Sequence, residues 1–379
     1  QTPEDVETLR YVVRADEQGR GFLYLNNYQD HVETIDQTDF CVTVQSDLGE
    51  VRFPQDGSLN LSKDACAILP YWFSLEGHLL KYATVQLITR VVYSHTAYYF
   101  FSKIRGMSGE FVFPEDEIIP VSGCSVQKHK VILSNSETSV FTFGQGNRCI
   151  VTVLNTNDAE RLWQYDTPKG RKLFLCDCPV LYKELEYPMG EEVALSVFPS
   201  EKESIVIHNR ELSRSGNIGP FITYAAFQDK KKYYFSVRDA SSVNSGEEST
   251  LKRPVVGSPI TSSKVVNARA VLQFEPDIFT GMKQVMLRIR YQGDIGYAFS
   301  NGEMFHDNFC NGAPWEIDLL PYKEKLLDKG MYIYVSPKKS GGFIDSSSAM
   351  AAMVEVFKDQ VAHIDSIELQ GIKSLPVSL

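Results

Sequence analysis

The sequence contains no apolar run of the roughly 18 residues that a membrane-spanning helix needs, so no such helix is predicted. Basic clusters are also scarce: apart from Lys230, Lys231 and Lys232 none stands out, and the formal net charge is −10. Nucleic acids and anionic membranes are bound through basic surfaces, so neither is expected as a partner. The lysine triplet lies between two aromatic runs, which favours a hairpin turn over a binding patch.

Catalytic motifs are missing as well. The sequence has neither a G-x-S-x-G nucleophile elbow nor a Walker loop. A glycosidase needs two carboxylic acids on opposite sides of the bond that it cleaves. Adjacent acids such as Glu191 and Glu192 are poorly placed for this, because neighbours on a strand point to opposite faces. We interpret such pairs as solvated surface charge and predict no catalytic residue in this chain.

The cysteines and histidines suggest no metal site. Seven cysteines are an odd number, so at least one thiol is unpaired, and most lie in apolar runs where a free thiol packs as a small hydrophobic group. Cys176 and Cys178 form a C-x-C pair without a second Cys or His pair at the spacing of a zinc site. The histidines are isolated from one another. We therefore predict no metal ligand and no cofactor.

The composition favours strands. Aromatic residues make up 12% of the chain, and bulky or β-branched side chains fit a pleated surface. Short alternating runs recur about every ten residues, as in all-β proteins. We predict an all-β fold with two or more β-sandwich domains and few short helices. The predicted strands include residues 9–14, 21–26, 40–45, 50–53, 79–89, 97–101 and 140–143. Asp56-Gly57 and Asn301-Gly302 are dipeptides that close hairpins.

Helical signals are few. One short helix is predicted over residues 158–163 with Asn157 as its N-cap, and another over 321–329 before Gly330. Residues 346–357 are rich in Ala and Met, which suits a helix, but the later apolar positions at Ile364, Ile367 and Leu369 favour strands at the end of the chain.

The domain boundary is predicted near Pro188, because a fresh strand pattern begins after it. This gives domains over residues 1–187 and 188–379. Residues 241–263 are rich in Ser and Gly, as a linker or a long loop within one domain would be.

The most function-like segment spans residues 306–317. It places a Trp, two Asn and an Asp in one predicted loop between strands, and sugars are held by an aromatic face together with amides and carboxylates. The carbohydrate-contact candidates are Asp307, Asn308, Asn311 and Trp315. In the alternative interpretation, Trp315 plugs the rim of the sandwich while the Asn and Asp residues set turns.

Several segments, taken in order, resemble a known family. They are Gly-Phe-Leu-Tyr-Leu-Asn-Asn-Tyr at 21–28, Gly-Glu-Val-Arg-Phe-Pro-Gln-Asp-Gly-Ser-Leu at 49–59, Ile-Leu-Pro-Tyr-Trp-Phe-Ser-Leu-Glu-Gly at 68–77 and Leu-Lys-Tyr-Ala-Thr-Val-Gln at 80–86. Residues 20–120 thereby resemble the second domain of family 35 glycoside hydrolases, the β-galactosidase family, and the run at 149–163 continues the likeness. Residues from about 265 on look like that family's galactose-binding-like jelly roll, with the loop at 307–316 as its best signature.

The resemblance implies a function by association. The family's catalytic glutamates lie on a (β/α)₈ barrel of about 250 residues, and nothing in this sequence fits such a barrel. The sequence begins at Gln1 without a targeting segment, so we expect either a removed leader or a piece of a larger polypeptide. The expected role is that of a non-catalytic accessory region of a β-galactosidase-like exo-glycosidase.

That role implies particular partners. They would be a catalytic barrel of the same polypeptide and a galactoside-containing glycan, in a parent protein that is secreted or periplasmic. Two alternatives stay open: a stand-alone, lectin-like carbohydrate-binding module, and a structural multi-sandwich protein.

Overall fold

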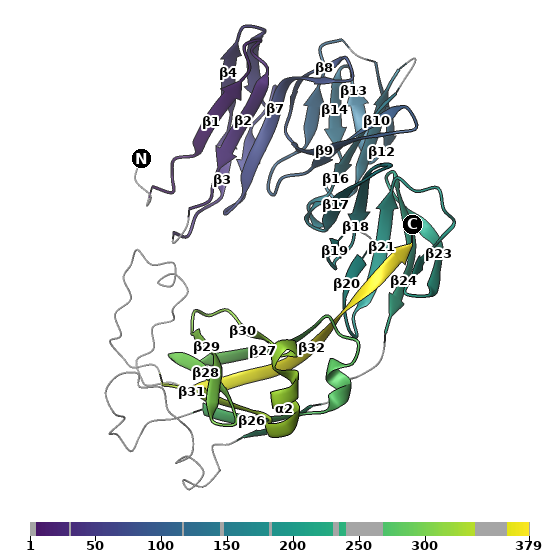
Figure 1. Cartoon of the computed structure of the whole chain (residues 1–379). Coiled ribbons are helices and arrows are strands. Elements are labelled where there is room, and N and C mark those ends of the chain that lie inside the picture. Colours follow the sequence, from purple (N-terminus) through teal and green to yellow (C-terminus); the bar gives the residue numbers. More distant parts are fainter. Residues whose placement is uncertain are drawn as a thin grey trace. The chain divides into compact units, whose positions relative to one another are not determined.

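The computed structural model describes residues 5–29, 32–115, 117–144, 148–181, 184–229, 235–239, 268–337 and 362–378 (Figure 1). The chain divides into two compact units. The first comprises residues 1–183, 193–227 and 377–379, and the second comprises 184–192 and 228–376. The structure is built almost entirely of strands, so the predicted all-β fold of several sandwiches is confirmed. The division at residue 187 stays a prediction. The segments at 241–263 and 346–357 lie outside the described residues, as do the three lysines at 230–232.

The first unit opens with a broad antiparallel sheet in the order β1-β2-β7-β8-β11-β14-β13. Two small strand pairs, β3-β6 and β4-β5, accompany it. The strands are β1 (Arg10–Ala15), β2 (Gly21–Asn26), β3 (Gln37–Phe40), β4 (Val42–Ser46), β5 (Gly49–Phe53), β6 (Leu59–Leu61), β7 (Cys66–Leu75), β8 (His78–Ala83), β11 (Glu110–Val112), β13 (Cys124–Gln127) and β14 (Lys130–Leu133).

A second sheet covers part of the first, in the order β12-β15-β16-β10-β9. Between the two sheets lies a core rich in phenylalanine. Its centre is Phe141, whose ring contacts Phe111 at 5.0 Å and Phe143 at 5.9 Å between centroids. The strands of this sheet are β9 (Gln86–Tyr93), β10 (Thr96–Ser102), β12 (Ile118–Ser122), β15 (Ser139–Phe143) and β16 (Cys149–Leu154).

A third sheet in the first unit runs β17-β18-β21-β24-β23-β22. It packs on the outer face of the second sheet, where Phe100, Phe198 and Phe221 share one apolar cluster. Because alternate residues of a strand face opposite ways, β10 buries Phe101 in the phenylalanine core and Phe100 in this outer cluster. The strands are β17 (Leu162–Thr167), β18 (Gly170–Leu175), β21 (Glu192–Phe198), β22 (Ser204–Ile207), β23 (Arg210–Ile218) and β24 (Phe221–Gln228). The short strand β19 (Val180–Leu181) also belongs to the first unit.

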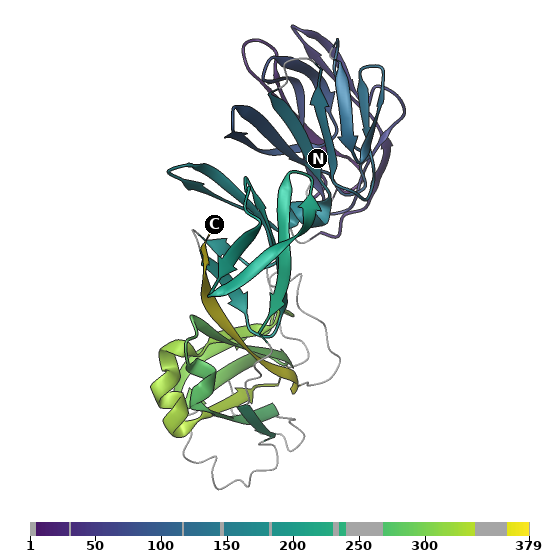
Figure 2. The same ribbon diagram turned by 90° about the vertical axis from the view of Figure 1, so that its right-hand side faces the viewer.

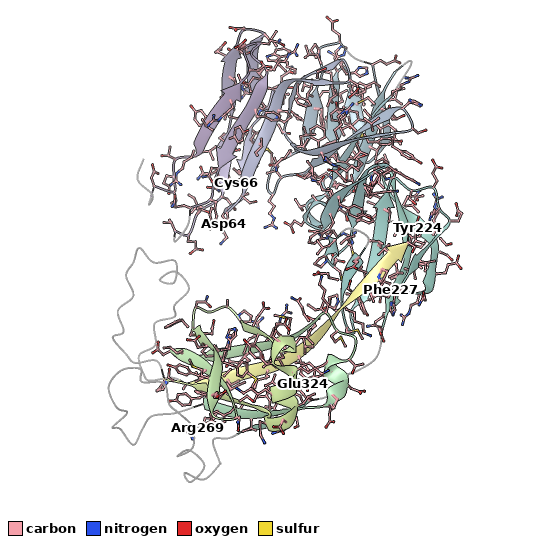
Figure 3. The ribbon with its side chains drawn as sticks, viewed as in Figure 1. Asp64, Cys66, Tyr224, Phe227, Arg269 and Glu324 are labelled. Atoms are coloured by element: carbon pink, nitrogen blue, oxygen red, sulfur yellow. The ribbon has the colours of Figure 1, made fainter. Side chains whose placement is uncertain are left out.

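The second unit is a sandwich of two antiparallel sheets, β20-β32-β27-β30 and β25-β26-β31-β28-β29. Its core includes Leu272, Leu287, Trp315 and Ile333. On the outer side of the second of these sheets, the guanidinium of Arg269, which is labelled in Figure 3, lies over the ring of Tyr334. The strands are β20 (Glu184–Pro188), β25 (Phe235–Asp239), β26 (Ala268–Phe274), β27 (Gln284–Gln292), β28 (Ile295–Ser300), β29 (Glu303–Phe309), β30 (Trp315–Asp318), β31 (Met331–Val335) and β32 (His363–Ser378).

The described helices are short: α1 (Thr156–Glu160), α2 (Lys323–Lys329), and the 3₁₀ turns η2 (Pro276–Phe279) and η3 (Leu320–Tyr322). Helix α2 packs beside β26 and β28 (Figure 2). It confirms the helix predicted before Gly330, whose φ of 67° and ψ of −166° are backbone angles that glycine adopts readily and other residues rarely do. A side chain there would also collide with the carbonyl oxygen of Leu272, 2.6 Å from the position of a Cβ atom.

Candidate functional site

The segment predicted to contact carbohydrate is mostly strand. Asp307 and Asn308 belong to β29, Asn311 lies in the connection at 310–314, and Trp315 begins β30. Asp307 is exposed and Asn308 and Asn311 are half-buried, whereas Trp315 is 1% exposed. The four residues therefore do not converge on one surface.

Trp315 belongs to the core of the second unit. Its ring meets Tyr291 edge-on at 5.9 Å between centroids, and its indole N–H donates to Nδ1 of His306 at 3.1 Å. Gly296 gives the indole room, because a Cβ atom there would lie 2.7 Å from Cζ3 of Trp315. This geometry corresponds to the alternative in which Trp315 fills the sandwich.

The side-chain amides of this segment form hydrogen bonds with other groups of the protein. The side-chain N–H₂ of Asn308 donates to the hydroxyl of Tyr291 at 2.9 Å, and that hydroxyl donates to the Asn308 carbonyl at 2.7 Å. Burial raises the pKa of Tyr291 to about 12, so the hydroxyl keeps its proton at neutral pH. Oδ1 of Asn311 accepts from the backbone N–H of Ala313 at 3.0 Å, which sets a turn. Carbohydrate contact by these residues stays a prediction.

Four carboxylates of the described residues form hydrogen bonds or ion pairs with a neighbouring Arg or Lys. A glycosidase's general acid needs a raised pKa. Instead, the hydrogen bond from Arg90 lowers the pKa of Glu76, and that from Arg171 lowers the pKa of Asp166. Among the ion pairs of the described residues, Asp158 is bound by Arg161 at 2.8 Å and Glu110 by Lys130 at 2.6 Å. Each of these four acids has a cation as its neighbour.

Metal binding finds no support in the part of the chain that the structure describes, where no three His, Cys, Asp or Glu side chains gather. All seven cysteines are free thiols. Cys176 and Cys178 are buried just after β18, and the hydrogen bond with Cys178 lowers the pKa of the Cys176 thiol. Cys41 is exposed, and so is Cys66, which is labelled in Figure 3.

Burial makes the cysteines differ in reactivity, because the thiolate is the reactive form. Burial raises the pKa of Cys149 to about 12, so this thiol stays protonated at pH 8. We expect a short treatment with iodoacetamide at pH 8 to alkylate Cys41 and Cys66 and to leave Cys149 unmodified, as read by peptide mass spectrometry. In guanidinium chloride Cys149 should react as the others do. Equal labelling of Cys149 and Cys41 in the native protein would contradict the structure.

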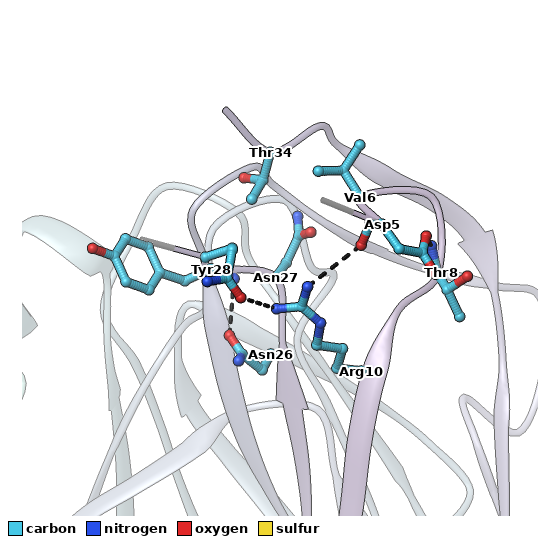
Figure 4. A pocket seen from close by; sticks show the side chains of 9 residues that line it. Asp5, Val6, Thr8, Arg10, Asn26, Asn27, Tyr28 and Thr34 are labelled. Atoms are coloured by element: carbon cyan, nitrogen blue, oxygen red, sulfur yellow. Dashed lines mark hydrogen bonds between the residues drawn. The ribbon is translucent and has the colours of Figure 1, made fainter. Parts of the chain in front are cut away.

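Two hollows in the first unit were not apparent from the sequence. The smaller, about 10 Å³, has room for a single water molecule (Figure 4). There the guanidinium of Arg10 donates to Oε1 of Gln29 at 2.6 Å and to the backbone carbonyl of Asp5 at 3.4 Å. Arg10 therefore links the segment at Asp5 to the segment at Gln29. The larger, about 400 Å³, is a mainly apolar groove. Tyr98 and Phe198 line it, and their rings lie 4.6 Å apart.

The first two sheets of the first unit form a sandwich around a phenylalanine-rich core. No curated protein matches the chain. The family model for "Beta-galactosidase, domain 2" matches residues 7–162, which run from just before β1 to the start of β17. No helix among the described residues is long and apolar enough to cross a bilayer. The resemblance stated from the sequence is confirmed for this segment: residues 7–162 match domain 2 of β-galactosidases, a non-catalytic β-sandwich domain of those enzymes.

Proposed function

We propose that this chain is the non-catalytic accessory region of a β-galactosidase-like exo-glycosidase. Its sandwiches support a catalytic barrel of the same polypeptide and contribute to carbohydrate binding. The observation that carries the proposal is the match of residues 7–162 to domain 2 of β-galactosidases.

An apolar edge supports docking of a further domain. Tyr11 and Val13 of β1 pair with Leu25 and Leu23 of β2, so all four side chains lie on one face of the sheet. The two leucines are buried, but Tyr11 is 64% and Val13 is 38% exposed, and Val12 on the other face is 52% exposed. Exposed apolar edge strands favour association with a partner. We assign this edge to the contact with the catalytic barrel.

The isolated chain is expected to show no hydrolysis of an aryl β-galactoside, whereas the longer protein that includes a catalytic barrel hydrolyses it. In the longer protein, Val12→Glu should lower the temperature of half-inactivation, because a carboxylate would be buried where about 1.5–3 kcal/mol of apolar burial was gained. Thermal inactivation of the hydrolase measures this.

Val92→Glu is the matched control for this experiment. Val92 is also an exposed valine on an edge strand, β9, with 55% of its surface exposed. This substitution should leave inactivation unchanged. Hydrolysis by the isolated chain would refute the accessory role, and equal inactivation of both variants would refute the docking edge.

A further inference from the structure

A shallow pocket of about 330 Å³ lies in the first unit where α1 meets the β17–β18 hairpin. We propose that this pocket binds a neutral sugar ring. The inference goes beyond the accessory role, and it names a site outside the segment at 306–317. The residues that line the pocket are Asn157, Glu160, Arg161, Trp163, Cys176 and Asp177.

Trp163 supplies an aromatic wall. The side chain is partly exposed, and its indole N–H donates to the carbonyl of Cys176 at 2.9 Å. The backbone N–H of Cys176 donates in turn to the carbonyl of Arg161 at 3.0 Å. These two bonds fix the indole and satisfy its polar atom, so the ring offers apolar surface to the pocket. The C–H face of a pyranose packs on such a surface.

Polar groups surround the indole. Asn157 is exposed on α1, and the side chains of Glu160 and Asp177 are 59% and 73% exposed. One oxygen of Asp177 lies 3.7 Å from Nη1 of Arg161, which is too long for a good hydrogen bond. Glu160 is already bound by Nη2 of Arg105, so the amide of Asn157 and the carboxylate of Asp177 are the groups left to accept hydrogen bonds from sugar hydroxyls.

A buried network holds Arg161 in place. Nε and Nη2 of Arg161 donate to Oδ1 of Asp158 at 3.1 and 2.8 Å. The other carboxylate oxygen accepts from Nδ2 of Asn155 at 2.9 Å and from the hydroxyl of Thr138 at 3.3 Å. Because the guanidinium is already ordered, a ligand that contacts it loses little side-chain freedom on binding.

The charges select a neutral ligand. The carboxylate of Asp177 disfavours an anion such as phosphate, and the guanidinium of Arg161 disfavours a cation. The volume lies at the lower end of the range for small-molecule sites, about 300–1,000 Å³. An aromatic wall with mixed polar groups at this size fits a single sugar ring, and an affinity of about millimolar is expected from so few contacts.

Saturation-transfer difference NMR on the full chain tests the site, with galactose, lactose and glucose as separate probes at millimolar concentration. We expect saturation of the ring C–H protons of at least one sugar by the wild-type protein. Trp163→Ala should abolish the transfer, and Asp177→Ala should weaken binding by about tenfold, which corresponds to about 1.4 kcal/mol. Since Trp163 also holds Cys176, the exposed Asp177 provides the variant that leaves the fold intact.

Asp328→Ala is the matched control. Asp328 is 69% exposed and forms a comparable surface ion pair, with Lys329 at 3.3 Å, but it lies on α2 of the second unit. It should bind sugar as the wild type does. Absence of transfer from the wild-type protein to all three sugars would overturn the inference, as would equal transfer in the wild type, Trp163→Ala and Asp177→Ala. Loss of transfer in Asp307→Ala with normal transfer in Asp177→Ala would move the site to the 306–317 segment.

The outcome is independent of the accessory role. A chain that binds no sugar but stabilises the hydrolase through β1 would refute the pocket and leave the accessory role standing. A chain that binds sugar at Trp163 but is unaffected by Val12→Glu would support the pocket and count against the docking edge.

Discussion

Replacement of Trp315 by alanine should lower the free energy of unfolding of the second unit by about 3–5 kcal/mol, the usual cost of truncating a buried Trp. The side chain is 1% exposed and fills the space beside Gly296 and Tyr291. Its loss leaves a cavity and removes the hydrogen bond to His306. Chemical denaturation of the wild-type and variant chains measures the difference in their free energies of unfolding.

Asp307→Ala serves as the control in the same segment. Asp307 is exposed on β29, and substitutions at such positions change stability by about 0.5 kcal/mol or less. If Trp315→Ala kept the stability of the wild type but lost sugar binding, Trp315 would be a ligand contact and its position in the core would be wrong.

Phe141→Ala should be equally damaging in the first unit, by about 3–5 kcal/mol. Phe141 is fully buried, and its ring contacts those of Phe111, Phe113 and Phe143. Truncation removes a shared partner of three aromatic rings, so the cavity cannot be closed by one small movement. The shift of the thermal transition of the first unit, followed by near-ultraviolet circular dichroism, tests this.

Two substitutions calibrate that measurement. Phe141→Leu fills more of the space than alanine and should cost less. Tyr28→Ala removes an aromatic ring of the first unit that is 51% exposed, and it should change stability by about 0.5 kcal/mol or less. Equal stability of Phe141→Ala and Tyr28→Ala would contradict the phenylalanine core.

Strands with clear alternation could be predicted from the sequence, but their ends depended on distant residues. The strand predicted at 21–26 is observed as β2. The single strand predicted at 79–89 is two, β8 and β9, in different sheets. The chain changes sheet at Thr84, whose hydroxyl donates to the Ser108 carbonyl and accepts from the Glu110 N–H. Because no Gly or Pro marks this point, the local pattern could not reveal it.

Caps and turns show the same limit. The first helix was predicted after Asn157, but it begins two residues earlier with Asn155 as its N-cap, which accepts from the backbone N–H of Asp158 at 2.8 Å. An asparagine at either position could accept the hydrogen bond of an N-cap. Asn155 is the N-cap in the structure, and its side-chain amide also donates to the buried carboxylate of Asp158. Asn301-Gly302 closes the β28–β29 hairpin as predicted, with positive φ at both residues. The hairpin predicted at Asp56-Gly57 is wrong, because β5 pairs with β4 and β6 with β3.

The candidate site was less predictable than the fold. The sequence identified Trp315 by its polar neighbours, yet those neighbours bond within the sandwich. The pocket at Trp163 joins residues at 157–163 with residues at 176–177 across the β17–β18 hairpin. Each of these residues is ordinary in its local sequence. Only the pairing of the two strands places an aromatic ring beside amide and carboxylate groups.

Strand β10 is buried on both faces, and this limits where the polypeptide can be divided into fragments. The family match ends at residue 162, but the cluster of Phe100, Phe198 and Phe221 takes members from residues well beyond it. A fragment that ends at residue 162 would expose the apolar outer face of the second sheet to water. Exposed apolar surfaces of this kind promote aggregation of folded domains. A fragment that keeps this cluster covered therefore has to extend at least through β24.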